Sequence, residues 1–252
     1  MMAGYRRIGQ VVLSADTVQE AELQAMLEAR RLVYPADYFT LHSSRVPANA
    51  GRTGLERVDR RQFDLCREQL SDARVDIVTC FDGWTPALPV TESCVDVQEG
   101  IAIPVVFTSE ALLDALRLMD AERIALVMPE SPRDAQVIVE CFAGAGFEVA
   151  DWAALDVAAE RPCRDFPAGR LPDVVDHLSL AAVDVVVLST SPALPALPAI
   201  AQVEAETGRP VVTAMTATVH MVLRRLGMVP VVPGAGALLS GARHYQAGAR
   251  RR

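Results

Sequence analysis

Carboxylate and hydroxyl side chains follow two apolar, β-branched segments of this chain, where they can move protons and stabilise charge. Asp82 comes directly after Asp76–Phe81, and the hydroxyl residues Thr190 and Ser191 come just after Asp184–Leu188. A carboxylate that is partly removed from water at such a position has a raised pKa, which suits a general base. Hydroxyl groups and the backbone amides beside them suit the stabilisation of an oxyanion. The pattern predicts proton transfer at a carbon next to a carbonyl or carboxyl group, with Asp82 as the base and Thr190 opposite it.

Other polar residues occupy comparable positions and are expected to bind substrate. Ser14 and Asp16 follow Arg7–Leu13, where they also suit the cap of the helix that comes next. The remaining substrate-binding candidates follow other strands or begin a helix: Gly83, Trp84, Glu130, Ser131, Ser191, Thr216 and His220. Structural roles explain the same residue types, because Asp-Gly is typical of a turn and a lone histidine in a helix is more often a packing residue.

The elements that must position these residues alternate between short β-branched segments and helical ones. This alternation is typical of βαβ units with a largely parallel sheet that is buried on both faces. Strands are expected over Arg7–Leu13, Tyr38–His42, Asp76–Phe81, Val105–Thr108, Arg123–Met128, Asp184–Leu188 and Val211–Ala214. Helices are expected up to about Arg31 after the first strand, over Ser109–Leu118 and over Thr216–Leu226.

The two halves of the chain resemble each other, which indicates an internal duplication. Val75–Thr79 parallels Val183–Val187, and Asp82 and Thr190 have the same offset as these strands (184 − 76 = 108 and 190 − 82 = 108). We therefore expect an α/β fold of two pseudo-symmetric lobes, each a mostly parallel sheet flanked by helices. The first lobe is expected to comprise 1–118 with 215–252 and the second 119–214. Parallel sheets bind ligands at the carboxyl ends of their strands, so the active site should lie in the cleft between the lobes.

Composition excludes several classes of function. All 24 basic residues are Arg, so the Lys of Schiff-base enzymes, pyridoxal-phosphate enzymes and P-loops is missing. The formal net charge of −8 argues against nucleic acid as a partner. The five cysteines show no metal-ligand spacing, no apolar run is long enough to cross a membrane, and the N-terminus has no leader pattern. We expect a cytoplasmic protein with a small-molecule substrate.

Taken together, these segments resemble the aspartate/glutamate racemase superfamily, in particular the branch of maleate cis-trans isomerases and arylmalonate decarboxylases. The resemblance spans nearly the whole chain, and its carriers are Arg6–Val12 with Ser14–Asp16, the strand ends at Asp82 and Thr190, Leu194–Pro198, Ala214–Ala217 and Val232–Gly236. It implies two α/β lobes, catalysis without a cofactor and a homodimer.

The resemblance also implies one catalytic cysteine in each lobe of the isomerases and racemases, whereas the decarboxylases keep only the second. Aligning the strands puts Asp82 and Thr190 at these positions, so both cysteines are expected to be replaced; Cys80 can take the first position only if the register shifts by two residues. Asp16 falls at an asparagine position and Glu130 at a tyrosine position. Three acidic residues would then face the substrate, which predicts a neutral or amine-bearing substrate, or carboxylates that share protons.

Three functions fit these residues. The favoured one is an isomerase or racemase that acts through an enolate, with a decarboxylase or other lyase on the same scaffold as the alternative. A second is a small-molecule binding protein that has kept the cleft and lost catalysis. A third is a metal-assisted lyase or hydrolase with Asp16, Asp82 and Glu130 as ligands for Mg²⁺ or Mn²⁺, although no metal is expected.

Overall fold

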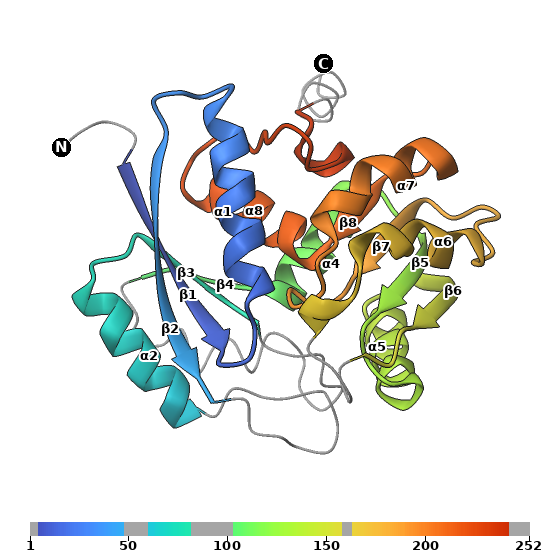
Figure 1. Ribbon diagram of the computed structural model, residues 1–252, viewed down its shortest axis with the longest axis horizontal. Helices are drawn as coiled ribbons and strands as arrows, with labels where there is room; N and C mark the ends of the chain where they lie inside the picture. The colour runs from blue at the N-terminus through green and yellow to red at the C-terminus, as the bar shows by residue number, and fades with distance from the viewer. Residues whose placement is uncertain (1–4, 48–59, 82–102, 158–162, 242–252) are drawn as a thin grey trace.

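The fold consists of two four-stranded parallel sheets flanked by helices, as the sequence predicts. A computed structural model describes residues 5–47, 60–81, 103–157 and 163–241. The strand orders are β2-β1-β3-β4 in the first sheet and β6-β5-β7-β8 in the second. Figure 1 shows the sheets side by side, with α1, α4 and α8 between them.

The strands are β1 (Tyr5–Leu13), β2 (Tyr38–Val46), β3 (Ile77–Cys80), β4 (Val105–Phe107), β5 (Arg123–Met128), β6 (Glu148–Ala154), β7 (Val185–Ser189) and β8 (Val211–Thr213). The α-helices are α1 (Val18–Arg31), α2 (Arg60–Asp72), α4 (Thr108–Leu118), α5 (Pro132–Gly144), α6 (Leu171–Asp176), α7 (Ile200–Thr207) and α8 (Ala214–Arg225). Four short 3₁₀ helices complete the described elements: η1 (Cys163–Asp165), η2 (Ala168–Arg170), η3 (Leu197–Ala199) and η4 (Ala237–Leu239).

Strand β6 is the element that sequence reasoning missed. Its sequence, Glu-Val-Ala-Asp-Trp-Ala-Ala, holds few β-branched residues, and none of its residues is fully buried because it forms the edge of its sheet. An edge strand of this kind lacks the apolar run on which the other predictions rested. Strand β2, the edge strand at the same place in the first sheet, was predicted, but it continues past His42 to Val46 through polar residues.

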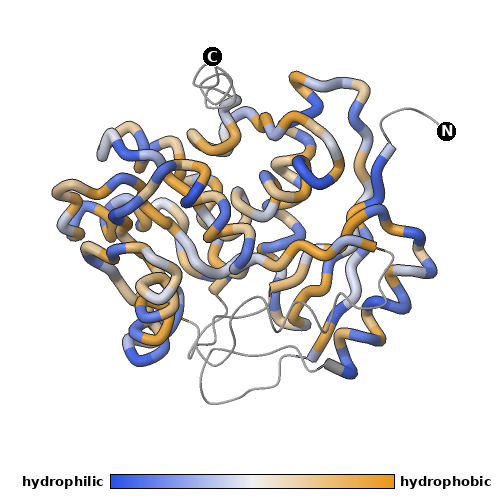
Figure 2. Tube along the Cα trace, turned by 180° about the vertical axis from the view of Figure 1, so that it is seen from behind, coloured by the Kyte–Doolittle hydropathy of each residue, from blue (hydrophilic) through white to orange (hydrophobic). Residues whose placement is uncertain are grey.

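The central strands are buried on both faces. In β1, Ile8 packs against a core that includes Leu23 of α1, whereas Val11 packs on the other face against Phe63 of α2. Figure 2 shows the outer helix α2 as largely hydrophilic, and apolar residues along the central strands. This layering brings the carboxyl end of each strand to a loop that faces the neighbouring sheet.

An equivalent hydrogen bond from a backbone amide to an aspartate carboxylate occurs in each sheet, which supports the duplication. Asp76 Oδ2 accepts a hydrogen bond from the Arg7 amide at 2.7 Å, and Asp184 Oδ2 accepts one from the Arg123 amide at 2.8 Å. The boundaries proposed for the two lobes stay a prediction. Helix α8, which follows β8 of the second sheet, packs against α4 and α1. No helix in the described ranges combines the length and apolar character needed to cross a membrane.

Candidate active site

The predicted site residues that the structure describes follow strand ends of both sheets or lie in the first turns of helices. Asp82, Gly83 and Trp84 lie outside the described residues, so the base proposed for the reaction stays a prediction. Cys80, the alternative to Asp82, is only 2% exposed and packs in the apolar core on the α2 side of β3, among residues such as Phe63.

Asp16 begins α1 and keeps one carboxylate oxygen for other partners. Its Oδ1 accepts hydrogen bonds from the amides of Val18 at 2.8 Å and Gln19 at 3.2 Å. Within the described residues, Oδ2 accepts no hydrogen bond. Burial raises the pKa of Asp16, while the two amides and the charge of Arg45 act in the opposite direction. Asp16 is therefore a buried carboxyl group whose Oδ1 binds the first amides of α1.

Glu130 lies at the end of β5 and is the most deeply buried acid of the predicted set, with 4% of its surface exposed. The hydroxyl of Thr190, which follows β7, donates to Glu130 Oε2 at 3.4 Å. Burial raises the pKa of Glu130 to about 7, and the hydrogen bonds from its own backbone and from Thr190 only partly oppose this rise. A carboxyl group with this pKa can give or take a proton at neutral pH.

The hydroxyls after β7 are arranged in a tight turn. Ser189 Oγ donates to the Ser191 carbonyl at 2.6 Å and accepts from the Ser191 amide at 3.2 Å, while Ser191 Oγ accepts from the Ala193 amide at 3.3 Å. Thr190 and Ser191 are both buried. This turn holds both hydroxyl residues beside the Glu130 loop.

A register shift changes which residue of this turn corresponds to position 82. Cys80 pairs with Phe107, but in the second sheet the equivalent pairing is made by Ser189 with Thr213, because the register shifts by one residue after Val187. Position 82 lies two residues after Cys80, and the residue two places after Ser189 is Ser191. The equivalent of position 82 is thus one residue later than the uniform offset of 108 predicts. The register therefore favours Ser191 over Thr190 as the counterpart of position 82.

Two predicted substrate-binding hydroxyls are used to begin helices. Ser131 Oγ accepts from the Asp134 amide at 3.2 Å and donates to the carboxylate of Asp134 at 2.8 Å, which caps α5. Thr216 and Thr213 form a reciprocal capping box at the start of α8. His220, one turn further along α8, is buried. Ser14, by contrast, is exposed next to Asp16.

Sequence reasoning missed Glu22, which connects α1 to the second sheet. Its Oε1 accepts a hydrogen bond from the Leu197 amide at 2.8 Å, across 175 residues of sequence. Burial raises the pKa of Glu22 to about 7, the amides of Leu197 and Ala196 oppose the rise, and the charge of Asp16 adds to it. A signal existed in the sequence, since Glu22 lies four residues from both Val18 and Met26 on the buried stripe of α1.

Cys163 of η1 was also missed, and no sequence pattern marks it. Burial raises the pKa of its thiol to about 11, and the charges of Glu130 and Asp16 add to that rise. The first-sheet residue Asp16 and the second-sheet residue Glu130 therefore both lie close enough to the Cys163 thiol to act on it electrostatically. Within the described ranges, no group of three His, Cys, Asp or Glu residues is arranged to hold a metal ion.

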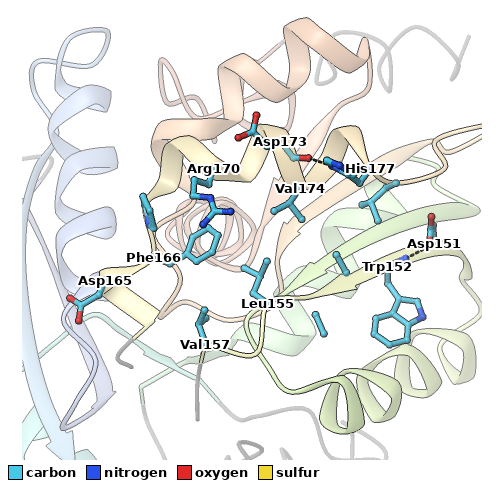
Figure 3. Close-up of a pocket in the computed structure, with 14 residues that line it drawn as sticks. Asp151, Trp152, Leu155, Val157, Asp165, Phe166, Arg170, Asp173, Val174 and His177 are labelled. Atoms are coloured by element: carbon cyan, nitrogen blue, oxygen red, sulfur yellow. Dashed lines mark hydrogen bonds between the residues drawn. The ribbon is translucent and has the colours of Figure 1, made fainter. Parts of the chain in front are cut away.

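A separate pocket of about 730 Å³ lies beside the edge strand β6 and holds none of the predicted site residues. Its walls come from β6, η1, η2 and α6, with Phe166, Arg170 and Trp152 among the lining residues (Figure 3). In the first sheet the corresponding connection contains the 13-residue helix α2, whereas α6 has 6 residues. The shorter helix covers less of the sheet and leaves this space open.

Comparison with known proteins agrees with this arrangement. A family model described as arylmalonate decarboxylase matches residues 91–239. A maleate isomerase from Pseudomonas putida is 39% identical over 249 residues, which cover 94% of this chain and 98% of the relative. The chain belongs to the arylmalonate decarboxylase and maleate isomerase family. It is therefore an enzyme of the isomerase or decarboxylase type that acts on a small molecule, as the sequence predicts.

Other members of the family show the same relationship. A maleate isomerase from Geobacillus stearothermophilus is 34% identical and covers 95% of this chain and 99% of its own length. A crystal structure of a maleate isomerase from Pseudomonas putida has a TM-score of 0.80 at 33% identity, covering 94% of this chain and 99% of that one. Unliganded arylmalonate decarboxylase has a TM-score of 0.73 at 19% identity, covers 94% of this chain and 100% of its own, and shares the fold.

Proposed function

We propose that this enzyme catalyses an isomerisation or racemisation, without a cofactor, through the enolate or carbanion of a small carboxylic or carbonyl compound. Asp82 is the general base in this proposal, at the position where the family's first cysteine is expected. The observation that carries it is the buried Glu130 carboxyl, which accepts from Thr190 and has a pKa of about 7. An acid–base pair on opposite sides of a cleft needs one group of this kind.

The reaction follows from these roles. The carboxylate of Asp82 takes the proton from the carbon next to the carbonyl. The electron pair of that C–H bond forms the C=C bond of the enolate, and the π pair of the carbonyl moves onto its oxygen. Hydroxyls and amides of the Thr190–Ser191 turn stabilise the oxyanion. Glu130, protonated at the start, returns a proton to the carbon from the other side, and solvent restores both carboxyl groups to their starting state. No thiol is required in this sequence.

A relative provides the contrast. The structure of a maleate cis-trans isomerase from Nocardia farcinica, 31% identical to this chain, is described as carrying a covalently bound succinylcysteine intermediate. If Asp82 stands at the first cysteine position here, the same scaffold performs proton transfer in place of thiol addition. The replacement of both cysteines remains part of this proposal.

The substrate class follows from charge. Asp16 and Glu130 are buried acids on the two sides of the cleft, and Asp82 would add a third. Two unit charges about 4 Å apart repel by roughly 4 kcal/mol at an effective dielectric constant of 20. A dicarboxylate would therefore bind poorly while these groups are ionised. We expect a neutral or amine-bearing substrate, or a monoacid that binds when Glu130 is protonated.

The test is proton NMR in D₂O with a panel of small acids, amino acids, amides, enones and malonates, run on the wild type and Asp82→Asn. Deuterium incorporation at one carbon, lost in the variant, would support the enolate and the base. Tight binding of maleate or malonate at neutral pH would contradict the proposed substrate class. Ligand binding without exchange would instead favour a binding protein that has lost catalysis.

Decarboxylation is the second candidate, and the match of the arylmalonate decarboxylase model to residues 91–239 favours it. Loss of CO₂ from a malonate produces the same enolate, which then needs one proton but no base. Release of CO₂ that persists in Asp82→Asn would identify the lyase. Loss of both activities in that variant would favour the isomerase.

A further inference from the structure

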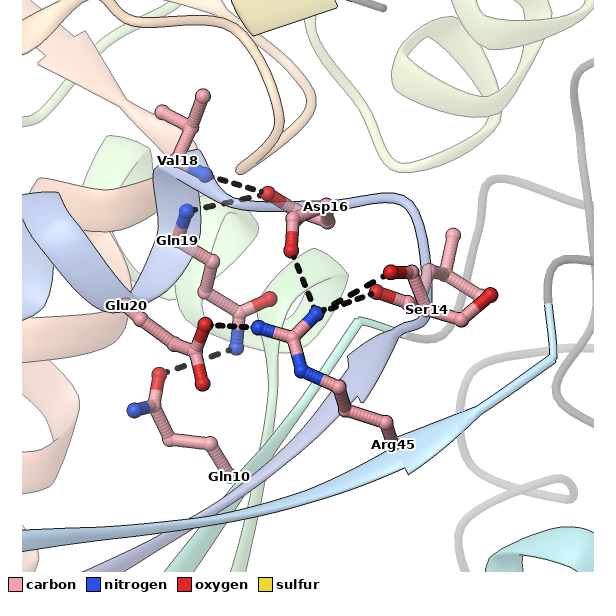
Figure 4. A network of polar contacts seen from close by, with 8 residues as sticks. Gln10, Ser14, Asp16, Val18, Gln19, Glu20 and Arg45 are labelled. Carbon is pink, nitrogen blue, oxygen red and sulfur yellow. Dashed lines mark hydrogen bonds and ion pairs between the residues drawn. The ribbon is translucent and has the colours of Figure 1, made fainter.

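The segment that connects β1 to α1 carries Ser14 and Asp16, and one side chain of β2 holds it. Arg45 Nη1 donates to the carbonyl oxygens of Leu13 at 3.3 Å, Ser14 at 3.3 Å and Asp16 at 2.8 Å. Its Nη2 forms an ion pair with Glu20 of α1 (Figure 4). Nη1 has two N–H groups for three carbonyls, so two of the carbonyls share one donor, while the second nitrogen of the planar guanidinium remains with Glu20.

The corresponding segment after β5 is held by a different device. The chain just past β6 donates three backbone amides to three consecutive carbonyls, in the pairs Leu155 with Met128 (2.8 Å), Val157 with Pro129 (3.0 Å) and Asp156 with Glu130 (3.1 Å). In the first sheet, β2 supplies one backbone bond to the β1–α1 segment within residues 5–47, from the Ser14 amide to the Val46 carbonyl at 2.7 Å. That bond uses an amide. The Leu13 carbonyl accepts from the Asp16 amide at 2.9 Å, and Arg45 contacts all three carbonyls of the segment.

We propose that Arg45 is a positioning residue that holds the Leu13–Asp16 segment so that Asp16 faces the cleft. The side chain of Arg45 is 37% exposed, and its described contacts go to this segment and to Glu20 of α1. The proposed role is therefore to act through the segment. Water can replace its hydrogen bonds to the three carbonyls, but water does not fix the segment in one conformation. The inference rests on the proposed function only where it assigns Asp16 to substrate binding.

The charged groups around the Leu13–Asp16 segment also affect the pKa of Asp16. The groups that act on Asp16 come from three elements: Glu20 and Glu22 of α1, Arg45 of β2 and Cys163 of η1. The charge of Arg45 lowers the pKa of Asp16 and that of Glu20 raises it. Replacing Arg45 by a neutral residue should therefore raise the pKa of Asp16, and replacing Glu20 should lower it.

Hydrogen exchange tests the positioning role without any assay of activity. In Arg45→Gln, we expect the amides of Asp16, Val18 and Gln19 to exchange at least about tenfold faster, while amides of β5 and β7 stay as in the wild type. Arg224→Gln is the matched control, because Arg224 forms an exposed ion pair with Asp114 away from the cleft. Unchanged exchange in the segment, or equally faster exchange in β5 and β7, would overturn the proposal.

NMR titration of the Asp16 carboxyl group distinguishes the positioning role of Arg45 from the effect of its charge. The pKa of Asp16 should rise in Arg45→Gln, fall in Glu20→Gln, and stay near the wild-type value in Arg45→Lys, which keeps the charge and loses the planar fork. Faster segment exchange in Arg45→Lys at an unchanged Asp16 pKa would support positioning by the guanidinium. A wild-type exchange rate in Arg45→Lys would show that charge alone is needed and would contradict it.

Kinetics then connect the residue to the reaction. If Arg45 acts through Asp16, the double variant Arg45→Gln/Asp16→Asn should lose no more activity than Asp16→Asn alone, within about twofold. Fully additive losses would overturn the role while leaving the proposed function intact. Failure of the wild type to turn over any compound would refute the proposed function, and the exchange experiment would still decide the role of Arg45.

Discussion

At the scale of single residues, two buried acids give this cleft its chemistry. Glu130 and Glu22 each have a pKa of about 7 because burial disfavours their charged forms. They differ in their partners. Glu130 meets a hydroxyl at the end of a strand, whereas Glu22 meets a backbone amide across the cleft. The proposed role of the first is to exchange a proton with a ligand, whereas the second joins α1 to η3.

Glu130→Gln should remove a titration from the pH profile. We expect kcat/KM of the wild type to change through a pKa near 7, and the Gln variant to lose this limb together with about 10²–10⁴-fold of activity. The profile is measured with the substrate found in the D₂O panel. Asp134→Asn is the comparison: the limb should persist but move to lower pH, because the charge of Asp134 contributes to the raised pKa of Glu130. A limb that survives in Glu130→Gln would assign it to another group.

Thr190→Val should move the same limb of the kcat/KM profile to higher pH. Its hydroxyl is the side-chain donor that favours the ionised form of Glu130, and valine fills nearly the same volume without a donor. The pKa of Glu130 is expected to rise above its wild-type value. Thr207→Val, in which a hydroxyl at the end of α7 is lost, should leave the limb in place. A downward shift would contradict the contact between Thr190 and Glu130.

At the scale of elements, helix starts and strand ends share residues with the site. Helix α8 begins with a capping box in which Thr213 Oγ1 accepts from the Thr216 amide at 3.1 Å and the Thr213 amide donates to Thr216 Oγ1 at 2.9 Å. Both residues are buried. The hydroxyl of Thr216 therefore already binds the backbone of Thr213. Its main described role is to begin α8, and its contact with substrate stays a prediction.

Thr213→Ala should lower the free energy of unfolding by about 1–2 kcal/mol, the usual cost of losing an N-cap bond. Thr17→Ala is a matched control, because Thr17 occupies the N-cap of α1 without a side-chain cap bond. The control should stay within about 0.5 kcal/mol of the wild type. Urea denaturation of the three proteins measures both effects. Equal losses would show that the capping box adds nothing beyond the side chain itself.

At the scale of the whole molecule, the two sheets are joined by a core and by a buried acid. One cluster contains Ile8 and Leu23 of the first half with Leu126 and Val212 of the second. Glu22 adds a polar contact to Leu197 of η3. The two halves are therefore joined both by apolar packing and by a carboxyl group that titrates.

Stability should fall as pH rises from 5 to 8. A carboxyl group with a pKa raised from 4.5 to about 7 contributes stability below pH 4.5 and loses it as pH rises through 7. At about 1.4 kcal/mol per pKa unit, each of Glu22 and Glu130 accounts for about 3 kcal/mol of this fall. Asp184, whose pKa is lowered by amide hydrogen bonds, acts only in the acid range below this window.

Urea denaturation at several pH values checks this dependence. Glu22→Gln keeps an acceptor for the Leu197 amide and removes the titration, so its stability should change less between pH 5 and 8 than that of the wild type. Gln24→Glu is a useful control, since it adds an exposed acid to the same helix. A Glu22→Gln protein with the wild-type pH dependence would show that this carboxyl group does not titrate in the window.

The sequence by itself determined the described strands other than β6, their parallel arrangement and the positions of Asp16, Glu130 and Thr190 after strand ends. Buried parallel strands appear in a sequence as apolar runs that end in polar loops, whereas β6 has no such run. Asp82 lies outside the described residues and remains a prediction. Only the tertiary structure decided the register shift after Val187 and the partners of Glu22 and Arg45. These depend on groups brought together from distant parts of the chain, about which local periodicity carries no information.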